Sequence, residues 1–246
     1  MLEINSCSAG YNGKEVLREV SLSVAPGKTG CIIGPTGCGK TTLLMLAAGL
    51  KRPEAGFILL DGNPVAPGDS RVSLILQDYG LFPWFTVAEN IALGLKVRRV
   101  EKDLRRAAVE RQLSRLGLSE CAHRYPRELS GGQQQRVAIA RSMALTPRLL
   151  LMDEPFSALD AMSRESLQEI LLQMLDDHDV TALLVTHSIE EAVYLGATIW
   201  VLAGSPARIS ASFDNPGQGR PGYRSDRSFF QLCSRIRQQL ALRRVI

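Results

Sequence analysis

The stretch Gly34-Pro35-Thr36-Gly37-Cys38-Gly39-Lys40-Thr41-Thr42 decides the fold of this 246-residue chain. It matches the pattern G-x-x-x-x-G-K-[ST], in which glycines let the backbone curl around phosphate oxygens. The loop joins an apolar stretch over residues 30–33, which favours a strand, to a helical stretch over residues 41–50. That helix would add the positive end of its dipole. We therefore expect Lys40 to neutralise the β- and γ-phosphates of a nucleotide and Thr41 to give an oxygen to Mg²⁺.

A second motif is the apolar run Leu149-Leu150-Leu151-Met152-Asp153-Glu154-Pro155, which ends in two carboxylates. Such a run is typical of a buried parallel strand that delivers acids at its C-terminal end. Asp153 would hold Mg²⁺ through water. Glu154 would accept the proton of the attacking water, a step for which a positioned carboxylate is worth about 10²–10⁴-fold in rate. The alternative is an ordinary pair of helix-starting acids, but the phosphate loop supplies the partner that a catalytic pair needs.

Two further polar residues follow predicted strands. Gln77 comes after residues 72–76, and His187 comes after residues 181–186. Ligands bind at the ends of parallel strands in such sheets. A neutral His187 would touch the γ-phosphate and hold the water and the base, while Gln77 would coordinate Mg²⁺ and report nucleotide occupancy to the segment behind it. Each could instead be a hydrogen-bonded connector, but their place relative to the other motifs favours a catalytic role.

The pentapeptide Leu129-Ser130-Gly131-Gly132-Gln133 stands between the phosphate loop and the acidic strand. A serine and two bare glycine amides offer convergent donors for a γ-phosphate, and we expect them to reach the nucleotide held by another copy of the same domain. Ser130 and Gln133 also match the S-x-x-Q capping box ahead of an apolar helical run. The two roles are compatible.

In their order along the chain, these motifs resemble those of ABC-transporter ATPases. The matching segments are Tyr11, residues 34–42, Gln77, residues 129–133, residues 149–155, Ser157-Ala158-Leu159-Asp160 and Thr186-His187. The resemblance spans about residues 1–205. It implies a head-to-tail homodimer that holds ATP between the phosphate loop of one subunit and the signature, Leu129 to Gln133, of the other.

The resemblance also implies the roles of individual residues. Tyr11 would stack on adenine, an interaction typically worth about 1–3 kcal/mol. Hydrolysis of ATP to ADP and phosphate would depend on Glu154, His187 and Gln77, and Mg²⁺ would be held by Thr41, Gln77 and Asp153. The residues expected to contact ATP are Tyr11, Gly34, Pro35, Thr36, Gly37, Cys38, Gly39, Lys40, Thr41, Thr42, Ser130, Gly131, Gly132, Gln133 and Asp160.

The pattern of strands and helices predicts an α/β fold: a P-loop NTPase core with an antiparallel β layer and an inserted helical subdomain. Residues 1–76 and 147–205 should form the nucleotide-binding core, and residues 77–146, which lack strand patterns, the helical subdomain. Residues 206–246 should form a C-terminal extension. Its terminal helix carries Phe229, Cys233, Ile236 and Leu240 on one face, a stripe that most often docks on a core.

Composition excludes several classes of protein. No apolar run approaches the roughly 20 residues that cross a bilayer, and the first residues are no signal peptide. The formal charge of +4 is too small and dispersed to imply nucleic acid. Five cysteines without C-x-x-C spacing argue against disulfides and metal, and for a reducing cytosol. We expect Lys40 and the following helix N-terminus to favour a thiolate at Cys38.

The segment from Tyr79 to Phe85 places Phe82, Trp84 and Phe85 around a proline directly behind Gln77. An exposed cluster there would bind a partner; the alternative is that the rings form the core of the helical part. In the family this region receives a short helix from the membrane permease, to which a substrate-binding protein delivers cargo. The chain would then sit on the cytoplasmic face of the inner membrane.

Three stretches narrow the resemblance to importers of nitrate, taurine and other sulfonates. They are residues 81–84, 201–209 and 224–230, although Gly204-Ser205-Pro206 departs from the importer pattern, where an arginine before the proline is usual. One alternative keeps the fold but serves an exporter or a lipid-extraction complex. Another is a soluble assembly factor that uses ATP binding as a conformational clamp.

Overall fold

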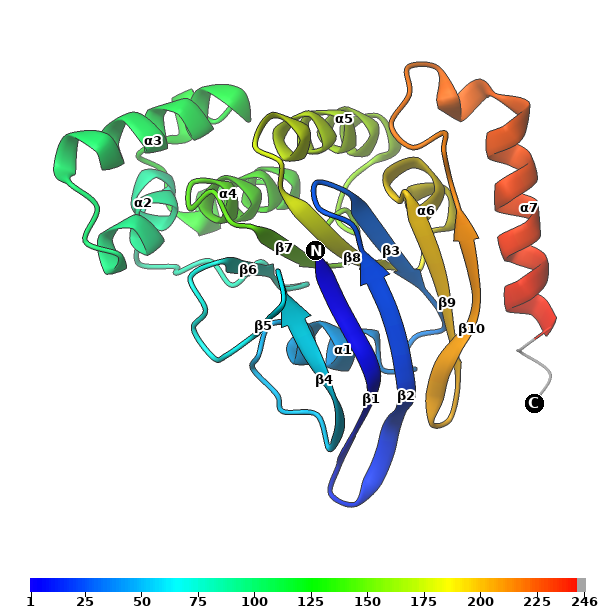
Figure 1. Cartoon of the computed structure of the whole chain (residues 1–246). Coiled ribbons are helices and arrows are strands. Elements are labelled where there is room, and N and C mark those ends of the chain that lie inside the picture. The colour runs from blue at the N-terminus through cyan, green and yellow to red at the C-terminus, as the bar shows by residue number, and fades with distance from the viewer. Residues whose placement is uncertain (243–246) are drawn as a thin grey trace.

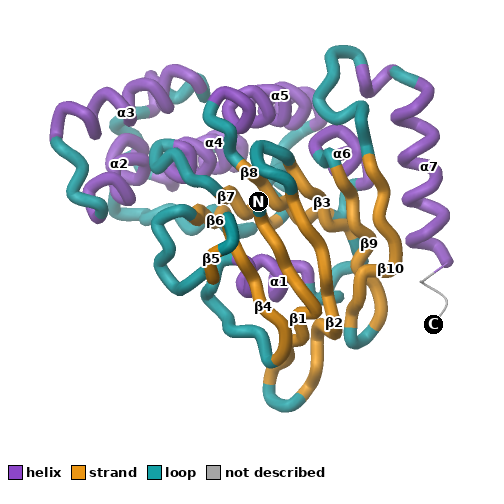
Figure 2. The backbone as a smooth tube through the Cα atoms, viewed as in Figure 1, coloured by secondary structure: helices purple, strands orange, loops and turns teal. Residues whose placement is uncertain are grey.

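The strands form one ten-stranded sheet, with strand order β5-β4-β1-β2-β10-β9-β3-β8-β7-β6. The structure is a computed structural model that describes residues 1–242. Helices cover both faces of the sheet, and a group of helices extends beyond the β6 edge (Figure 1). Figure 2 shows that this group, α2 to α4, contains no strand.

The parallel half of the sheet carries the phosphate loop and the acidic strand. It consists of β6 (Val72–Ile75), β7 (Leu149–Asp153), β8 (Thr181–Thr186), β3 (Thr29–Ile33) and β9 (Thr198–Gly204), each parallel to its neighbours within this group. Every residue of β3, β7 and β8 is buried. Near-continuous apolar runs are typical of parallel strands covered on both faces, and these are the runs that the sequence showed.

Side chains of each buried strand alternate between two cores. Leu149 and Leu151 of β7 face the helix α1 (Lys40–Ala47) and the antiparallel strands, whereas Leu150 and Met152 face α4, α5 and α6. The period of two along a strand requires this division. α5 (Ala161–Asp177) and α6 (Ile189–Leu195) therefore lie on the face opposite α1.

The antiparallel half is built from β1 (Leu2–Tyr11), β2 (Lys14–Val24), β4 (Ala55–Leu60) and β5 (Asn63–Pro64). A further strand, β10 (Ala207–Asp214), pairs antiparallel with β9 and meets β2 at Ala207 and Leu17. The sequence pattern predicts an extension of the core from residue 206 onward. The structure instead places 207–214 inside the sheet, where β10 joins its two halves.

The helical insertion agrees with its sequence pattern. It contains α2 (Val87–Val97), α3 (Lys102–Arg115), two short 3₁₀ turns at Ser119–Cys121 and Pro126–Glu128, and α4 (Gly131–Met143). Thr86 and Glu89 form a capping box that starts α2. α2 and α4 pack against each other, which holds the signature at the start of α4 beside the core.

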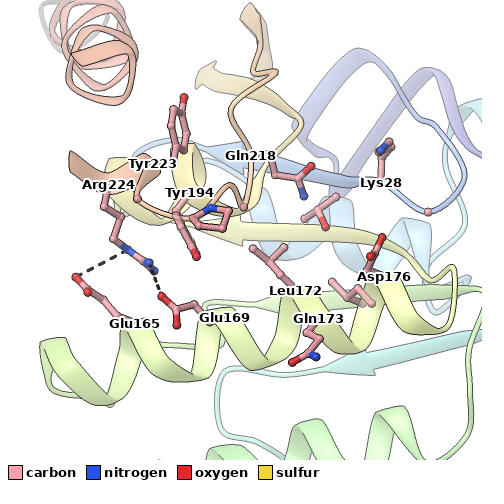
Figure 3. Close-up of a pocket in the computed structure, with 16 residues that line it drawn as sticks. Lys28, Glu165, Glu169, Leu172, Gln173, Asp176, Tyr194, Gln218, Tyr223 and Arg224 are labelled. Atoms are coloured by element: carbon pink, nitrogen blue, oxygen red, sulfur yellow. Dashed lines mark hydrogen bonds and ion pairs between the residues drawn. The ribbon is translucent and has the colours of Figure 1, made fainter. Parts of the chain in front are cut away.

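The last helix, α7 (Arg227–Leu242), packs against α6 and β9. Phe229, Cys233 and Ile236 are buried and Leu240 is partly buried, as the apolar stripe predicted. Arg224, just before α7, lies with its Cζ 3.3 Å from the ring centroid of Tyr194. It pairs with Glu165 and Glu169 of α5 at one end of a pocket of about 750 Å³ (Figure 3). Of the helices within residues 1–242, none is long and apolar enough to span a membrane.

Candidate nucleotide-binding site

The phosphate loop connects β3 to α1 and closes around Lys40. The ammonium of Lys40 is buried and donates to the carbonyl oxygens of Gly34 and Pro35, both at 2.9 Å. Gly39 has φ +105°, and a Cβ there would lie 2.9 Å from both Leu17 Cδ2 and Val16 Cγ1. Only glycine suits such a position, so the close packing of β2 against Gly39 fixes the shape of the loop. The α1 N-terminus follows at once, with its free amides at the loop.

Thr41 and Asp153, the residues predicted to bind a cation, are in direct contact. Thr41 Oγ1 donates to Asp153 Oδ2 at 2.7 Å. Burial raises the pKa of Asp153, and the neighbouring Glu154 adds to the rise, while the Thr41 hydrogen bond and Lys40 oppose it. Gln77, exposed beyond the end of β6, lines the same cavity. A hydroxyl, a carboxylate and an amide oxygen are hard ligands of the kind that Mg²⁺ prefers, so these residues fit the ion.

Glu154 and His187 face each other across neighbouring strand ends. His187 Nδ1 lies 3.0 Å from Glu154 Oε2. Glu154 adopts φ +46°, a left-handed conformation that is uncommon for residues other than glycine, and its backbone N–H donates to Val185 O at 3.0 Å. Backbone outliers of this kind concentrate at functional sites, where the surrounding structure holds them. Here the outlier aims the carboxylate at the cavity.

A cavity of about 540 Å³ brings most of the predicted residues together. Its walls are Val16, Thr36, Gly37, Gly39, Lys40, Thr41, Thr42, Gln77, Asp153, Glu154 and His187. Parallel strands present their carboxyl ends at one edge of the sheet, which explains why residues far apart in sequence meet here. Val16 was not predicted to line the site, because a valine within a strand carries no motif.

Tyr11 lies outside the walls of this cavity. It is the last residue of β1, its side chain is half-exposed, and Lys51 Nζ lies 4.1 Å from the ring centroid. The Lys51 ammonium is therefore placed for a cation–π contact with one face of the ring. Adenine stacking on Tyr11 stays a prediction.

The signature also lies apart from the cavity of its own chain. Ser130 caps α4, since Ser130 Oγ accepts from Gln133 N at 3.2 Å and Gln133 Oε1 accepts from Ser130 N at 3.0 Å. Asp160 caps α5 in the same way, through Ser163 N at 3.0 Å. The capping role is confirmed, and Ser130 and Gly131 are exposed at the helix start.

The expectation of a thiolate at Cys38 was wrong. Burial raises the pKa of the thiol, and the charge of Lys40, which lowers it, does not compensate. Cys38 Sγ lies 3.7 Å from the carbonyl oxygen of Leu202, which it meets as a weak donor. The sequence placed Cys38 correctly beside a cation but did not show that β9 would cover it.

Glu191 is a buried acid behind the site, and no sequence motif predicted it. Burial raises its pKa, which Thr186 and Arg164 oppose, and its carboxylate accepts from Thr186 Oγ1 at 2.6 Å. An acid in the first turn of a helix usually serves the helix dipole at the surface, so its sequence position gave no sign of burial.

The fold, the phosphate loop and the polar residues at the neighbouring strand ends define a P-loop nucleotide hydrolase. A family model described as "ABC transporter" matches residues 17–157. The chain therefore belongs to the ABC transporter family, as its ATP-hydrolysing, ATP-binding cassette.

Relatives extend this identification. The taurine import ATP-binding protein TauB of Yersinia pestis bv. Antiqua (strain Antiqua) is 44% identical over 209 residues, which cover 85% of this chain and 82% of that protein. The bicarbonate transport ATP-binding protein CmpC of Synechococcus elongatus (strain ATCC 33912 / PCC 7942 / FACHB-805) is 43% identical over 235 residues, 93% of this chain and 35% of that protein. A solved dimeric ATP-binding cassette, bound to ADP and Pi in a post-hydrolysis state, is 28% identical in sequence and matches with a TM-score of 0.79. The match covers 87% of this chain and 98% of the solved chain.

Proposed function

We propose that this chain is the ATPase subunit of an importer and that it hydrolyses ATP in the cavity between Lys40, Asp153, Glu154 and His187. The observation that carries the proposal is the contact between Glu154 and His187 on one wall of the cavity that also holds the phosphate loop. A loop for phosphates, a buried acid for a cation and an oriented carboxylate are the parts that phosphoryl transfer to water requires.

Each residue has a defined task in this reaction. Lys40 exchanges its two loop carbonyls for phosphate oxygens, which binds the β- and γ-phosphates. Glu154 accepts the proton of the attacking water, and His187 holds that carboxylate and the γ-phosphate in line. Thr41, Asp153 and Gln77 would hold Mg²⁺, which supplies charge neutralisation on the phosphates when it is bound.

The second half of each ATP site comes from a partner in a head-to-tail dimer. Ser130 and Gly131 are exposed at the start of α4, outside the cavity of their own chain. Free amides at a helix N-terminus attract anions, so this surface suits a γ-phosphate presented by a second subunit. The dimeric cassette among the structural relatives supports such an assembly.

The permease binds at the segment behind Gln77. Phe82 and Trp84 are exposed, with ring centroids 5.7 Å apart. Phe82 lines a largely apolar groove of about 550 Å³ beside the edge strand β6. Exposed aromatic residues around a groove are typical of protein interfaces. Arg141 of α4 donates to the carbonyl oxygens of Tyr79 and Gly80 at 2.7 and 2.6 Å, so this segment is tied directly to the signature helix. This contact gives nucleotide binding a route to the permease.

The importer takes up taurine or related sulfonates. The taurine import relative supports this substrate and disfavours the exporter and assembly-factor alternatives. Nitrate and bicarbonate remain the competing anions, and bicarbonate is included because of the bicarbonate transport relative. The cassette would be peripheral to the cytoplasmic face of the inner membrane, held there by the permease, and would serve a substrate-binding protein only indirectly.

Growth of a deletion strain tests the transport assignment. We expect the strain to lose growth on taurine or alkanesulfonates as sole sulfur source, and the wild-type gene, but not Glu154→Gln, to restore it. Parallel cultures on nitrate as sole nitrogen source and at low bicarbonate distinguish the other anions. Growth loss on one of those alone would reject the sulfonate assignment, and undiminished growth on all of them in a strain without redundant importers would reject the whole class.

A further inference from the structure

A buried hydrogen-bonded acid stands behind the Glu154–His187 pair. Glu191 Oε2 accepts from Thr186 Oγ1 at 2.6 Å, and the same hydroxyl oxygen accepts from the Ser188 backbone N–H at 3.0 Å. Thr186 and Ser188 are the two chain neighbours of His187. Glu191 therefore fixes the turn that presents the imidazole to the cavity, although it does not line the cavity itself.

The second carboxylate oxygen of Glu191 faces α5. Glu191 Oε1 lies 3.6 Å from Arg164 Nε, and Arg164 also donates from a terminal nitrogen to Leu159 O at 2.7 Å. Leu159 belongs to the turn that leads into α5. Glu191 is buried and Arg164 about two-thirds buried, so water weakens their attraction far less than that of an exposed pair. The ion pair thus joins the turn after β8 to the turn after β7.

Leu159 in turn contacts the signature. A Cβ added at Gly132 would lie 2.6 Å from Leu159 Cδ2, so glycine and leucine are packed closely there. A continuous series of contacts runs through His187, Thr186, Glu191, Arg164, Leu159 and Gly132. One end of the series lies at the cavity of this chain, and the other lies at the surface proposed to face the nucleotide of the partner.

We propose that the Glu191–Arg164 ion pair is a positioning element that aligns His187 with the Leu159 turn, and so sets the two catalytic surfaces of one subunit relative to each other. This inference rests on the proposed function. Because both residues act through others, their loss should affect the transition state rather than the binding of ATP. Because the two residues act as one unit, replacing both should lower kcat no more than replacing one of them.

Steady-state kinetics of Glu191→Gln, Arg164→Met and the double variant test the proposal. We expect each variant to lower kcat by about tenfold or more, the scale on which small misplacements of catalytic groups act, with the KM for ATP little changed. The kcat of the double variant should equal that of the less active single variant. Glu190→Gln and Arg237→Met provide matched controls, because they make the same chemical changes in an exposed pair at 3.1 Å on α6 and α7. Both controls should keep the wild-type kcat.

Thermal unfolding measured on the same samples separates positioning from stability. A loss of thermal stability with an unchanged kcat per folded subunit would overturn the proposal, and so would independent, multiplying losses in the double variant. If Glu191→Gln does not fold, Arg164→Lys provides the test instead. This variant keeps the positive charge but loses the guanidinium fork that reaches Leu159. An unchanged kcat in Arg164→Lys would again contradict the positioning role. Glu154→Gln is assayed in parallel to distinguish the proposed function from the positioning role of the ion pair. If Glu154→Gln keeps its ATPase activity, the proposed role of Glu154 as the base is wrong, whatever the Glu191 and Arg164 variants show.

Discussion

His187 Nδ1 lies 3.0 Å from Glu154 Oε2 because the two residues follow neighbouring parallel strands in matched register. Asp153 of β7 pairs with Val185 of β8, and the next backbone N–H, that of Glu154, bonds the Val185 carbonyl. The carboxylate and the imidazole therefore emerge side by side. A general base is effective only in the right orientation, and this contact would orient Glu154 for the base role proposed for it.

His187→Ala should lower kcat while leaving ATP binding nearly intact. The variant removes the partner that orients Glu154, but it removes no charge from the phosphate loop. Phosphate release and nucleotide binding, measured separately, check the expectation. His123→Ala, at an exposed histidine of the insertion, is the control and should behave as wild type. Equal losses in the two variants would refute a specific role for His187.

Gly131→Asp should abolish hydrolysis by the homodimer. A Cβ at Gly131 meets the Ala158 Cβ at 3.5 Å, an ordinary contact, so the substitution is tolerated at the Cβ. The added carboxylate would repel the γ-phosphate that the partner is proposed to present here. Gly132 is a poorer choice, because Leu159 crowds it. Gly131→Asn, which matches the aspartate in size without its charge, should keep more activity.

Mixing inactive Gly131→Asp with inactive Lys40→Ala should recover activity. In a mixed head-to-tail dimer, one site contains both lesions and the other contains neither. The ATPase rate of the mixture, compared with each variant alone, measures the effect. No recovery, in mixtures shown to contain mixed dimers, would argue that the signature acts within its own chain or not at all.

Cys38 should react slowly with iodoacetamide at neutral pH. Burial raises its thiol pKa, so little thiolate is present there, and the rate should increase as the pH rises above the ordinary thiol range. MgATP should slow the reaction further by covering the loop, and Cys38→Ser should keep its ATPase activity. Mass spectrometry of the peptide over time gives the rate. Rapid labelling at pH 7 would contradict the burial of the thiol.

Trp84→Ala should release the protein from membranes without reducing the ATPase activity of the isolated subunit. The ring is 67% exposed, so its loss costs little stability but removes an anchor of the proposed permease contact. Phe230→Ala, at a ring 59% exposed on α7, is the matched control. Pull-down from native membranes should recover companion chains with wild type and Phe230→Ala only. Equal recovery with Trp84→Ala would place the permease elsewhere.

The sequence predicted the core and the nucleotide cavity because both depend on local patterns. Lys40, Gln77, Asp153, Glu154 and His187 each lie at the C-terminal end of a parallel strand or in the loop after it, and parallel strands bring such positions to one edge. The roles given to these residues remain predictions, as do the boundaries of the subdomains.

What the sequence could not predict depends on contacts between distant segments. Leu202 of β9 covers Cys38, and α5 supplies the counterion of Glu191. The burial of either group is set by tertiary packing, which motif spacing does not encode. β10 escaped prediction because a short strand near the end of a chain looks the same from its sequence whether or not it pairs with a sheet.

ATP hydrolysis by purified wild type and Glu154→Gln tests the central claim most directly. The substitution preserves the size of the side chain but removes the base, while Lys40, Thr41 and Asp153 still bind the nucleotide. Glu110→Gln, an exposed acid on α3, is the control. The account predicts that phosphate release falls by about 10²-fold or more in Glu154→Gln while bound ATP and an ATP-dependent dimer are retained. Phosphate release near the wild-type rate in Glu154→Gln would contradict it.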